Sequence, residues 1–593
     1  MSHNVGDDQT GADLIAAFVA QHCSPSVHLV TGGACAFIVD ALGRHPEADY
    51  VCFQHEQAAA MAADAVWRVK GKVGVTLATS GPGATNLVTG IACSWFDSIP
   101  SLHITGQVND SESRDALGAQ VRQAGFQETD IVSMVMPITK FATRVHSVEE
   151  LVSSLSEGLQ TAISGRMGPV LIDVPMNVQK EYVPRNLWDQ ALQPIPRRAS
   201  PRWLDWTVVS SFLGDAKRPL VIIGGGAALA GTAADIQRWC ESEGIPYVSS
   251  WSGLPSLRPN GLLYQGSLGV YGSPVANWTV QASDKVLALG TRLDNRQRSG
   301  NPRAFAPFSQ VLVIDIDDQE LAKFRHESNY QTSLADLGSW PEVSQPLGQT
   351  TAWQEWRQNL QEVGPKIPDG TKESVALGEL NPYDAVQEIQ KYISPNAIVV
   401  ADCGANLCWV YQSFAPSNLR LFTAAGNSPM GYSLPAAIGA KIAEPQTPVW
   451  CFIGDGGLQM NIQELQTIAH YRLNITIIIL NNHGYGIIKQ FQDAYFDGRH
   501  EASGSGYSVP DFERLAEAYG IRYHAIHALD EILPNLNSSV PSIVDVFLPE
   551  GAQITPKLEL DRFLHDQFPY ATPSEVAELM PVPYPPRPSL LAD

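Results

Sequence analysis

The stretch VWCFIGDGGLQMNIQELQTIAHYRLNITIIILNN, residues 449–482, places two apolar runs on either side of a helical pattern. The first run ends at a Gly-rich turn, and the whole predicts a strand, a crossover helix and a second, parallel strand. A right-handed crossover returns the chain beside its start, so Asp455 and Asn482 would both follow the carboxyl ends of neighbouring strands. Ligands of open α/β sheets bind at that edge. The stretch therefore predicts a parallel sheet with a ligand site at this edge.

Three blocks of the chain alternate short apolar runs with helical patterns in the same way, which predicts the α/β class with three parallel-sheet domains. The blocks span residues 1–185, 203–345 and 381–550, and a proline-rich tail follows at 551–593. The segment VPRNLWDQALQPIPRRASPRW is expected to be a linker, and the tail is expected to lie over the surface or a cleft. The first and third blocks share the order strand, Gly-rich turn, helix, strand, which suggests a repeat.

Composition argues against several classes of protein. The formal net charge of -22 argues against a general affinity for nucleic acid or anionic membranes. The first residues, MSHNVGDDQTGADL, lack the basic and apolar regions of a secretory signal, and no apolar run reaches the roughly 20 residues that span a bilayer. The eight cysteines include no CxxC pair and no metal-ligand spacing with histidine. We therefore expect a cytoplasmic protein with reduced thiols, no nucleic-acid partner and no membrane association.

The polar residues at the predicted sheet edge suit a magnesium–diphosphate site. Asp455 offers a carboxylate and Asn482 an amide oxygen, and nearby backbone carbonyls add further hard oxygen ligands of the kind that Mg²⁺ takes. Glycines let the backbone approach a ligand closely, and a helix start after such a turn favours a phosphate group. These glycines are Gly456, Gly457, Gly484 and Gly486. A lone GDG would more often be a plain turn, but GDG followed by NN predicts a clamp for a metal and a diphosphate.

This pattern resembles the thiamine diphosphate signature of the acetolactate synthase and pyruvate decarboxylase superfamily. The resemblance covers nearly the whole chain: HEQAAAMAADAVWRVKGKVGVTLATSGPGATNLVTG resembles the pyrimidine-binding module, and PMGYSLPAAIGA resembles the segment that supports the bent cofactor. It implies that Asp455, Asn482 and the carbonyl of Gly484 hold Mg²⁺. It also implies that thiamine diphosphate is contacted by Gly404, Asn406, Ser428, Met430, Gly456, Gly457, Tyr485 and Gly486.

The resemblance also assigns catalytic residues. Glu56, in HEQ, matches the family's catalytic glutamate, whose carboxylate hydrogen-bonds the pyrimidine ring and promotes loss of the proton at C2 of the thiazolium. Without the resemblance, Glu56 would be interpreted as a helix-start residue favoured by the helix dipole. Met430 matches the bulky apolar support under the bent cofactor, although an isolated methionine is usually core filler. Phe126 and Gln127, in GFQET, match the synthases and complete the catalytic set.

The same resemblance predicts a flavin site in the central block. IIGGGAAL lacks the third glycine of a dinucleotide fingerprint, because Leu229 stands in its place. GTRLDNR and VIDIDDQEL resemble the flavin-binding segments of acetolactate synthases. They imply that FAD is contacted by Gly224, Gly225, Gly226, Arg292 and Asp315. The alternative is a central domain without a ligand, as in the simple decarboxylases of the superfamily.

The expected substrate side departs from that of acetolactate synthases. Arg296 matches an arginine for a second carboxylate, and Ile488 and Phe491 are expected beside the substrate, with Phe491 in place of the usual tryptophan. The segment DCGANLCWV lacks the usual glutamine and histidine near the thiazolium. PMGYSLPAAIGA and the tail motif ITPKLEL look closer to synthase homologues of branched-sugar pathways, which transfer an acetyl unit from pyruvate to a keto sugar.

These features together predict a carboligase that uses thiamine diphosphate, Mg²⁺ and FAD. It would decarboxylate pyruvate or a similar 2-oxo acid and transfer the acyl unit to a second carbonyl compound, such as a keto sugar. The alternatives are an acetolactate synthase, in which pyruvate is also the acceptor, a flavin-dependent 2-oxo acid oxidase and a non-catalytic binding homologue. The resemblance also implies a homodimer or homotetramer with its active site at the subunit interface.

Overall fold

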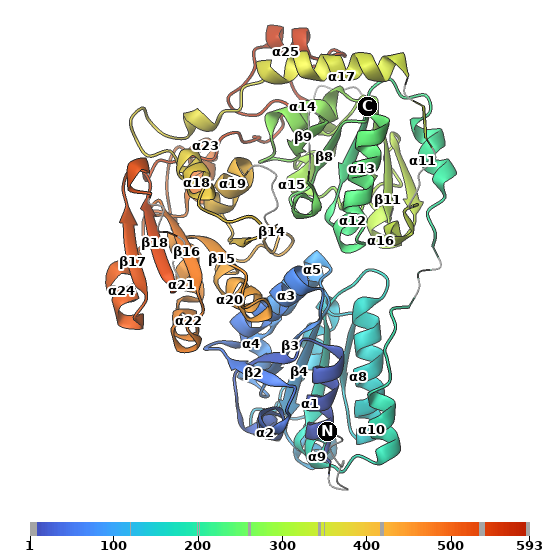
Figure 1. The fold of residues 1–593 in the computed structure, drawn as a ribbon, viewed down its shortest axis with the longest axis vertical. Coiled ribbons are helices and arrows are strands. Elements are labelled where there is room, and N and C mark those ends of the chain that lie inside the picture. Colours follow the sequence, from blue (N-terminus) through green and yellow to red (C-terminus); the bar gives the residue numbers. More distant parts are fainter. Residues whose placement is uncertain are drawn as a thin grey trace.

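The computed structural model describes residues 9–118, 120–198, 200, 202–258, 263–341, 346–348, 350–414, 420–532, 536 and 540–588. Within these residues, three six-stranded sheets form the centres of three domains (Figure 1), and the strands in each sheet pair in parallel. The predicted α/β class with three parallel-sheet domains is confirmed. None of the helices in the described part of the chain combines the length and the apolarity needed to cross a bilayer.

The first sheet has the strand order β2-β1-β3-β4-β6-β5. Its strands are β1 (Ser26–Leu29), β2 (Asp49–Cys52), β3 (Gly74–Ala78), β4 (Ser101–Gln107), β5 (Phe141–Arg144) and β6 (Val170–Pro175). The α-helices of this domain are α1 (Gly11–His22), α2 (Ala36–Arg44), α3 (Glu56–Lys70), α4 (Pro82–Asn86), α5 (Val88–Asp97), α6 (Arg114–Leu117), α7 (Ile131–Val135), α8 (Val148–Ile163), α9 (Met176–Lys180) and α10 (Arg185–Ala191). Strands β3, β4 and β6 are buried along their whole length, as expected of a parallel sheet that is covered on both faces.

The central sheet has the order β12-β11-β10-β7-β8-β9. Its strands are β7 (Pro219–Ile223), β8 (Tyr247–Ser249), β9 (Tyr264–Ser267), β10 (Lys285–Leu289), β11 (Gln310–Asp315) and β12 (Tyr330–Leu334). The α-helices around it are α11 (Trp206–Leu213), α12 (Gly225–Leu229), α13 (Ala233–Glu243), α14 (Pro274–Ala282), α15 (Asn295–Arg298), α16 (Asp318–Ala322) and α17 (Thr351–Val363). The order reverses between β7 and β10, and such a switch point leaves a crevice at the carboxyl ends of the two strands.

The third sheet has the order β14-β13-β15-β16-β18-β17. Its strands are β13 (Ile398–Ala401), β14 (Arg420–Phe422), β15 (Val449–Gly454), β16 (Ile475–Asn481), β17 (Arg522–Ile526) and β18 (Ser542–Phe547). Its α-helices are α18 (Pro382–Gln390), α19 (Ala405–Ser413), α20 (Ser433–Ala443), α21 (Asp455–Met460), α22 (Leu465–Tyr471), α23 (Gly486–Tyr495) and α24 (Phe512–Tyr519). Counted from its own first strand, this order is the same as in the first sheet, in agreement with the repeat that the sequence suggests.

The first and third domains dock through two alanine-rich helices, α3 and α20, which lie against each other (Figure 1). The approach is close: a Cβ atom on Gly439 of α20 would lie only 2.7 Å from Cα of Ala62 in α3. A buried polar contact lies beside these helices. Arg68 forms ion pairs with Asp64 (2.6 Å) and Asp97 (2.8 Å) and donates to the carbonyl of Thr423 in the third domain (3.0 Å).

The segments expected as a linker and a tail both pack on folded domains. Residues 185–191 of the expected linker form α10, and Trp188 on this helix is buried in the core of the first domain. Beyond the third sheet, the chain forms α25 (Pro573–Leu579), which lies against α17 beside the central domain (Figure 1). A proline-rich composition therefore did not prevent this tail from adopting a fixed path.

Candidate functional site

The carboxyl edge of the third sheet carries the predicted metal ligands. Strands β15 and β16 are neighbours, and Gly454 at the end of one pairs with Leu480 near the end of the other. Asp455 is the first residue of α21, directly after β15, and Asn482 follows β16 directly. Both side chains are buried, with exposed fractions of 1% and 3%. The two side chains therefore come from adjacent strand ends, as the sequence predicts.

Several buried polar atoms at this edge have no hydrogen-bond partner of ordinary geometry among the described residues, although the Tyr507 hydroxyl lies close enough to the Asp455 carboxyl to lower its pKa in part. They are Asp455 Oδ2, Asn482 Nδ2, Asn406 Oδ1, Ser428 Oγ and the Tyr507 hydroxyl. Burial raises the pKa of the Asp455 carboxyl above its ordinary value. Because buried polar groups in folded proteins are normally hydrogen-bonded, such a cluster indicates that a polar ligand belongs here. In the described part of the chain, no three His, Cys, Asp or Glu side chains gather at one metal site, so a cation here would depend on one carboxylate plus neutral oxygens.

Four predicted glycines leave room around these atoms. A Cβ atom on Gly456 would lie 2.6 Å from the ring of Tyr485, and one on Gly457 would lie 2.9 Å from the Asp402 carboxylate. A Cβ on Gly486 would meet the Asn482 amide, and one on Gly484 would meet Lys489. Larger residues would therefore fill the space beside the unpaired polar atoms. Tyr485 stands directly before α23, and its ring lies edge-on to that of Tyr507.

Asp402 is a residue of this edge that the sequence analysis missed. It follows β13, is fully buried, and accepts hydrogen bonds from the N–H groups of Gly431 (2.9 Å) and Ser433 (2.9 Å) and from the Ser433 hydroxyl (3.0 Å). These bonds hold the turn that presents Met430, and Gly431 has a φ of +80° that favours glycine. The signal was present, since NAIVVADCG ends a strand on an aspartate and a glycine much as VWCFIGDG does.

The start of α19 forms another part of the same edge. Gly404 precedes the helix, and Asn406 in its first turn donates from Nδ2 to the carbonyl of Cys403 (2.5 Å). A Cβ atom on Gly454 would lie 3.5 Å from the Asn406 amide, which puts this side chain beside the end of β15. Gly404, Asn406 and Asp455 thus lie near one another, as the resemblance implies.

Glu56 lies at the edge of the first sheet rather than in the group around Asp455. It is the first residue of α3, is 8% exposed, and accepts a hydrogen bond from Asn86 Nδ2 (2.9 Å). A Cβ atom on Gly83 would lie 3.1 Å from its carboxylate, and Gly81 in the same turn is in contact with Gln127. Glu56 and Gln127 therefore border one turn. Phe126, in contrast, is 82% exposed.

Glu128 fixes the loop that carries Phe126 and Gln127. Its carboxylate accepts hydrogen bonds from the backbone N–H groups of Arg114 (2.8 Å), Ala124 (3.1 Å) and Gly125 (3.2 Å). Burial opposes ionisation of this carboxyl, but the three N–H donors outweigh it and hold the pKa of Glu128 below its ordinary value. The motif GFQET contains Glu128, yet the sequence gives no sign that its partners lie up to 14 positions away.

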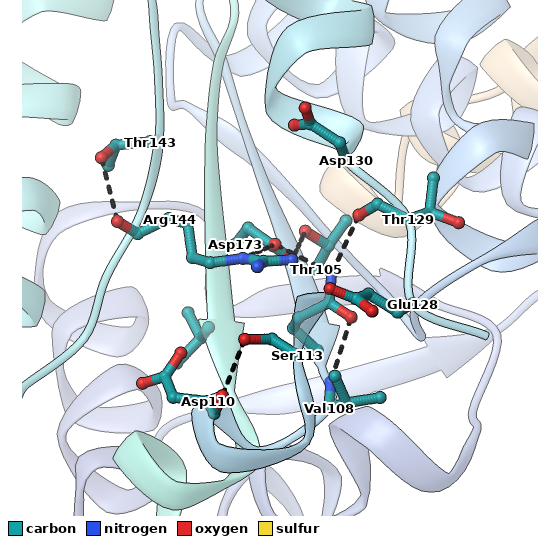
Figure 2. A network of polar contacts seen from close by, with 12 residues as sticks. Thr105, Val108, Asp110, Ser113, Glu128, Thr129, Asp130, Thr143, Arg144 and Asp173 are labelled. Carbon is teal, nitrogen blue, oxygen red and sulfur yellow. Dashed lines mark hydrogen bonds and ion pairs between the residues drawn. The ribbon is translucent and has the colours of Figure 1, made fainter. Parts of the chain in front are cut away.

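A second carboxylate, that of Asp173, is connected to the same loop through a network of hydrogen bonds (Figure 2). Asp173 is buried and accepts from the Thr105 hydroxyl (2.7 Å), from Gln107 Nε2 (3.1 Å) and from Arg144 Nε (3.0 Å). Gln107 Nε2 also donates to the carbonyl of Thr129 (3.0 Å). The network therefore connects strands β4, β5 and β6 to the segment that presents Gln127.

The two edges are connected within the chain, although no hydrogen bond joins Glu56 to Asp455 in the described residues. The backbone N–H of Gln54 donates to the buried Glu464 carboxylate (3.1 Å), and Gln57 Nε2 donates to Asn461 (3.3 Å). Asn461 in turn donates to the carbonyl of Gly431 (2.8 Å). Residues on both sides of Glu56 are thus held against the segment that follows α21.

The predicted flavin residues border a cavity of about 440 Å³ at the switch point of the central sheet. Gly225, Gly226, Arg292 and Asp315 line it, while Gly224 lies behind the wall and packs on the backbone of Gly290. Burial raises the pKa of the Asp315 carboxyl to about 6. The cavity has the size of a small-molecule site, and its walls come mostly from the first and the central domain, with Phe422 of the third domain at one side.

The predicted substrate residues come from two elements. Arg296 lies on α15, with its guanidinium 6.0 Å from the centre of the Tyr271 ring. Ile488 and Phe491 lie on α23, with exposed fractions of 47% and 42%, and the Phe491 ring contacts that of Tyr495 (4.7 Å). These apolar side chains are open to solvent in the single chain.

Three family models match consecutive parts of the chain. The N-terminal TPP binding domain of thiamine pyrophosphate enzymes matches residues 9–134, their central domain matches residues 208–337, and their C-terminal TPP binding domain matches residues 402–546. The last match contains Asp455 and Asn482, and the first contains Glu56 and Gln127.

Curated relatives match over most of the length. The chain is 36% identical over 534 residues to a protein named acetolactate synthase from Arthrospira platensis, with 86% of this chain and 89% of the relative covered. It is 34% identical over 569 residues to an acetolactate synthase large subunit from Parasynechococcus marenigrum, with 92% and 89% covered. It is 32% identical over 537 residues to the isozyme 2 large subunit of Escherichia coli, with 88% and 93% covered. The chain therefore belongs to the thiamine diphosphate-dependent, acetolactate synthase-like family of enzymes.

Proposed function

We propose that this enzyme decarboxylates pyruvate and transfers the acetyl unit to a second 2-oxo acid, which is the acetolactate synthase reaction. The observation that carries the proposal is the cluster of unpaired buried polar atoms at the edge of the third sheet. It lies in a chain that resembles proteins named acetolactate synthase over most of its length. The broader carboligase reaction with a different acceptor is the second candidate.

The residues at the carboxyl edge of the third sheet fit a magnesium ion and a diphosphate. Asp455 would supply the only protein charge on the metal, Asn482 an amide oxygen and Gly484 a backbone carbonyl. The N-terminal turns of α21 and α23, with their glycines and Tyr485, would face the phosphate oxygens. Bound thiamine diphosphate would supply the nucleophilic carbon that attacks the 2-oxo acid.

Glu56 would hold a proton at the pyrimidine ring of the cofactor. Its carboxyl group is buried and has one hydrogen-bond donor, Asn86, so part of its accepting capacity is free for a ring nitrogen. Asp402 would fix the turn that supports the bent cofactor through Met430, and Glu128 would fix the loop that brings Gln127 beside Glu56. Of these three carboxylates, one would thus hold a proton and the other two would position parts of the site.

The central cavity supports FAD as a second cofactor. Its position at the switch point of a 3-2-1-4-5-6 sheet, with Gly225 and Gly226 at one strand end and Arg292 at the other, is the usual place of a dinucleotide. The purified protein should therefore be yellow and release FAD on denaturation. If pyruvate bleaches the flavin, the oxidase alternative replaces this proposal, and a colourless protein that is fully active would rule the flavin out.

A specific observation favours the second candidate. The side chains expected to face the substrate differ from those of acetolactate synthases at Phe491, which stands in place of the usual tryptophan, and at Asn406, in a segment that lacks the usual glutamine and histidine. A ketone or aldehyde of another kind, such as a keto sugar, would then accept the acetyl unit. One experiment tests both candidates: incubation with pyruvate, thiamine diphosphate and Mg²⁺, alone and with a panel of carbonyl acceptors, followed by mass analysis of the products.

The outcomes of that experiment separate the candidates. Formation of 2-acetolactate from pyruvate alone supports the first candidate, and a mixed product at the expense of 2-acetolactate supports the second. No consumption of pyruvate by cofactor-loaded protein would contradict both.

A second copy of the chain would complete the active site. A partner would cover three exposed apolar side chains. These are Phe126, on the loop beside Glu56, and Ile488 and Phe491, beside the carboxyl edge of the third sheet. The test mixes Glu56→Gln and Asp455→Asn subunits. If each site takes Glu56 from one chain and Asp455 from the other, each mixed dimer has one intact site, so a 1:1 mixture with random exchange regains about a quarter of the wild-type activity. No recovery after proven subunit exchange would contradict a shared site.

A further inference from the structure

Helix α5 reaches the region where the three domains come together (Figure 1). Its last residue is Asp97, whose carboxylate is 6% exposed. One oxygen of this carboxylate accepts a hydrogen bond from the backbone N–H of Gly426 (2.8 Å). The other accepts from the N–H of Ala425 (2.8 Å) and forms the ion pair with Arg68 (2.8 Å). Asp97 therefore ties the first domain to one turn of the third domain through charge-assisted hydrogen bonds.

The turn that Asp97 holds leads to two residues that are expected to contact thiamine diphosphate. Residues 423–430 run from the end of β14 to Ser428 and Met430. Within this segment, the N–H of Ser428 donates to the carbonyl of Ala424 (2.8 Å), and Ser428 has a φ of +49°, which residues other than glycine seldom adopt. Asp97 therefore fixes the start of a short, hydrogen-bonded segment that presents both residues.

The same contact forms part of the wall of the central cavity. Arg68 and Asp97 line this cavity, and so does Arg292, the predicted flavin ligand from the central domain. Arg292 donates to the carbonyl of Phe96 (2.8 Å), the residue before Asp97. A Cβ atom on Gly426 would lie 3.0 Å from Nη1 of Arg292 and 2.6 Å from Cβ of Phe96. The turn after β14 therefore packs directly on the residues that form the cavity wall.

We propose that Asp97 couples the central cavity to the thiamine diphosphate site, so that FAD in the cavity and thiamine diphosphate each tighten the binding of the other. Asp97 is then a positioning residue, because it acts on the second site through the turn at residues 423–426. The inference rests on the proposed function in its choice of the two cofactors.

The physical reason for the coupling is conformational entropy. A ligand that fills the cavity restricts the motion of its walls, among them Asp97 and Arg292. The walls in turn restrict the turn that begins the segment with Ser428 and Met430. This segment therefore loses part of its conformational freedom before thiamine diphosphate binds, and the binding of thiamine diphosphate has less ordering left to do. The same coupling acts in the other direction, since binding free energies are reciprocal.

The first test measures the binding of each cofactor with and without the other, using full-length protein from which both have been removed. FAD binding is followed by flavin fluorescence, and thiamine diphosphate binding by calorimetry with Mg²⁺ in excess. We expect saturating FAD to lower the Kd of thiamine diphosphate by about fivefold or more, and saturating thiamine diphosphate to lower the Kd of FAD by the same factor. Unchanged Kd values would overturn the proposal, and so would a failure of FAD to bind.

Two variants assign the coupling to the contact of Asp97 with the turn. Asp97→Asn sets an amide N–H₂ against groups that donate hydrogen bonds, whereas Gly426→Ala keeps the carboxylate and adds a methyl group where the turn meets Phe96. Each change should bring the coupling factor close to one. This factor is a ratio of two Kd values of the same variant, so a general loss of cofactor affinity does not imitate the effect. Wild-type coupling in either folded variant would contradict the proposal.

The matched control is Glu444→Gln. Glu444 accepts two hydrogen bonds from Arg420 (2.7 Å each), and the Arg420 guanidinium also donates to the carbonyl of Val69 in the first domain (3.3 Å). This pair joins the same two domains, but it holds the start of β14 rather than the turn after its end, and neither residue is among the described residues that line the cavity. Glu444→Gln should therefore keep the wild-type coupling factor. An equal loss of coupling in this control would show that Asp97 has no special role.

The second test follows the turn itself by hydrogen–deuterium exchange and mass spectrometry. The amides of Ala425 and Gly426 donate to Asp97, so peptides that cover residues 421–431 should exchange more slowly when FAD alone is bound. We expect exchange in the wild type to slow by about fivefold, in line with the coupling factor, and we expect no such change in Asp97→Asn. Equal exchange of the wild type with and without FAD would overturn the proposal.

Both tests are independent of the reaction, because neither uses pyruvate. Coupled binding of the two cofactors in a protein that consumes no pyruvate would contradict the proposed function and leave this inference standing. Turnover of pyruvate by a protein that binds the two cofactors independently would do the reverse.

Discussion

Replacing Asp455 by asparagine should separate the cost of a buried charge from the benefit of cofactor binding. Asp455 is 1% exposed, one of its oxygens has no partner among the described residues, and burial raises the pKa of its carboxyl. Without metal, the buried carboxylate therefore lowers the free energy of unfolding. We expect Asp455→Asn to leave the unfolding temperature of the cofactor-free protein unchanged or to raise it.

The cofactor-bound protein should respond in the opposite way. A ligand present at about 100 times its Kd stabilises the protein by ~2.7 kcal/mol, which for a domain of this size is a shift of about 5–10 °C. Loss of the only carboxylate on the metal should weaken binding by about 100-fold, at least as much as an outer-shell change does. At the same ligand concentration, the stabilisation then falls to ~0.4 kcal/mol, or about 1 °C.

The assay is thermal unfolding with and without thiamine diphosphate and Mg²⁺, and Asp545→Asn is the matched control. Asp545 lies on the neighbouring strand β18 and is equally buried, but both of its oxygens accept hydrogen bonds, from Asn481 (3.1 Å) and from the Tyr523 hydroxyl (3.0 Å). In Asp545→Asn, the new amide N–H₂ would face a group that donates a hydrogen bond, which should lower the free energy of unfolding by about 1–3 kcal/mol. The rise in unfolding temperature caused by the cofactor should be retained. A full shift in Asp455→Asn, or a cofactor-free protein destabilised as much as the control, would refute the reasoning.

Three further changes test other parts of the site. Glu56→Gln should slow hydrogen–deuterium exchange at C2 of bound thiamine diphosphate by about 10²–10⁴-fold with little change in cofactor affinity, and exchange at the wild-type rate would make Glu56 a structural residue. Glu128→Ala should expose residues 113–130 to limited proteolysis, because three backbone N–H groups lose their acceptor, whereas Glu128→Gln should protect them in part. Burial raises the pKa of Glu464 from its ordinary value of 4.5 to about 7, so its stabilising contribution is complete below about pH 4.5 and is lost as the pH rises to about 7. The free energy of unfolding of the wild type should therefore fall by up to ~3 kcal/mol between about pH 5 and 8, and Glu464→Gln should remove this fall. If the free energy of unfolding depends on pH in the same way in both proteins, Glu464 does not have this role.

The regular parts of the fold were predictable because they depend on local patterns. β7, β10, β13, β15 and β16 lie in the centres of their sheets and were visible as apolar runs, since strands covered on both faces must be apolar throughout. The half-exposed strand β5 and the three-residue strand β14 carry no such run and were not predicted. Glycines that directly follow strands also form a local pattern, and they indicated both the cavity of the central domain and the ligand site at the carboxyl edge of the third sheet.

The missing parts of the site depend on contacts between distant segments. The tail at Leu558 lies against Val270, which in turn lies beside Arg296, more than 250 positions before the tail, and no periodicity in the sequence predicts that contact. Glu128 gains its role from N–H groups of a loop whose path the sequence does not specify. The exposure of Phe126 could not be anticipated either, because a motif match gives no information on which side of the loop the ring points.

The helices that occupy equivalent positions in the first and third sheets, α3 and α20, contact each other across the domain boundary. Equivalent helices of the two domains thus contact each other, as the same surface patch does on the two subunits of a symmetric dimer. Duplication and fusion of a gene for one self-pairing unit would give this arrangement, and the two domains expressed as separate chains should then still associate, which a pull-down would test. After the fusion, one copy could keep Glu56 and the other Asp455, and each could lose the counterpart that it no longer needed. The first and third domains of one polypeptide would then correspond to the two subunits of an ancestral homodimer. Each domain would have kept a different part of a site that each subunit once carried in full.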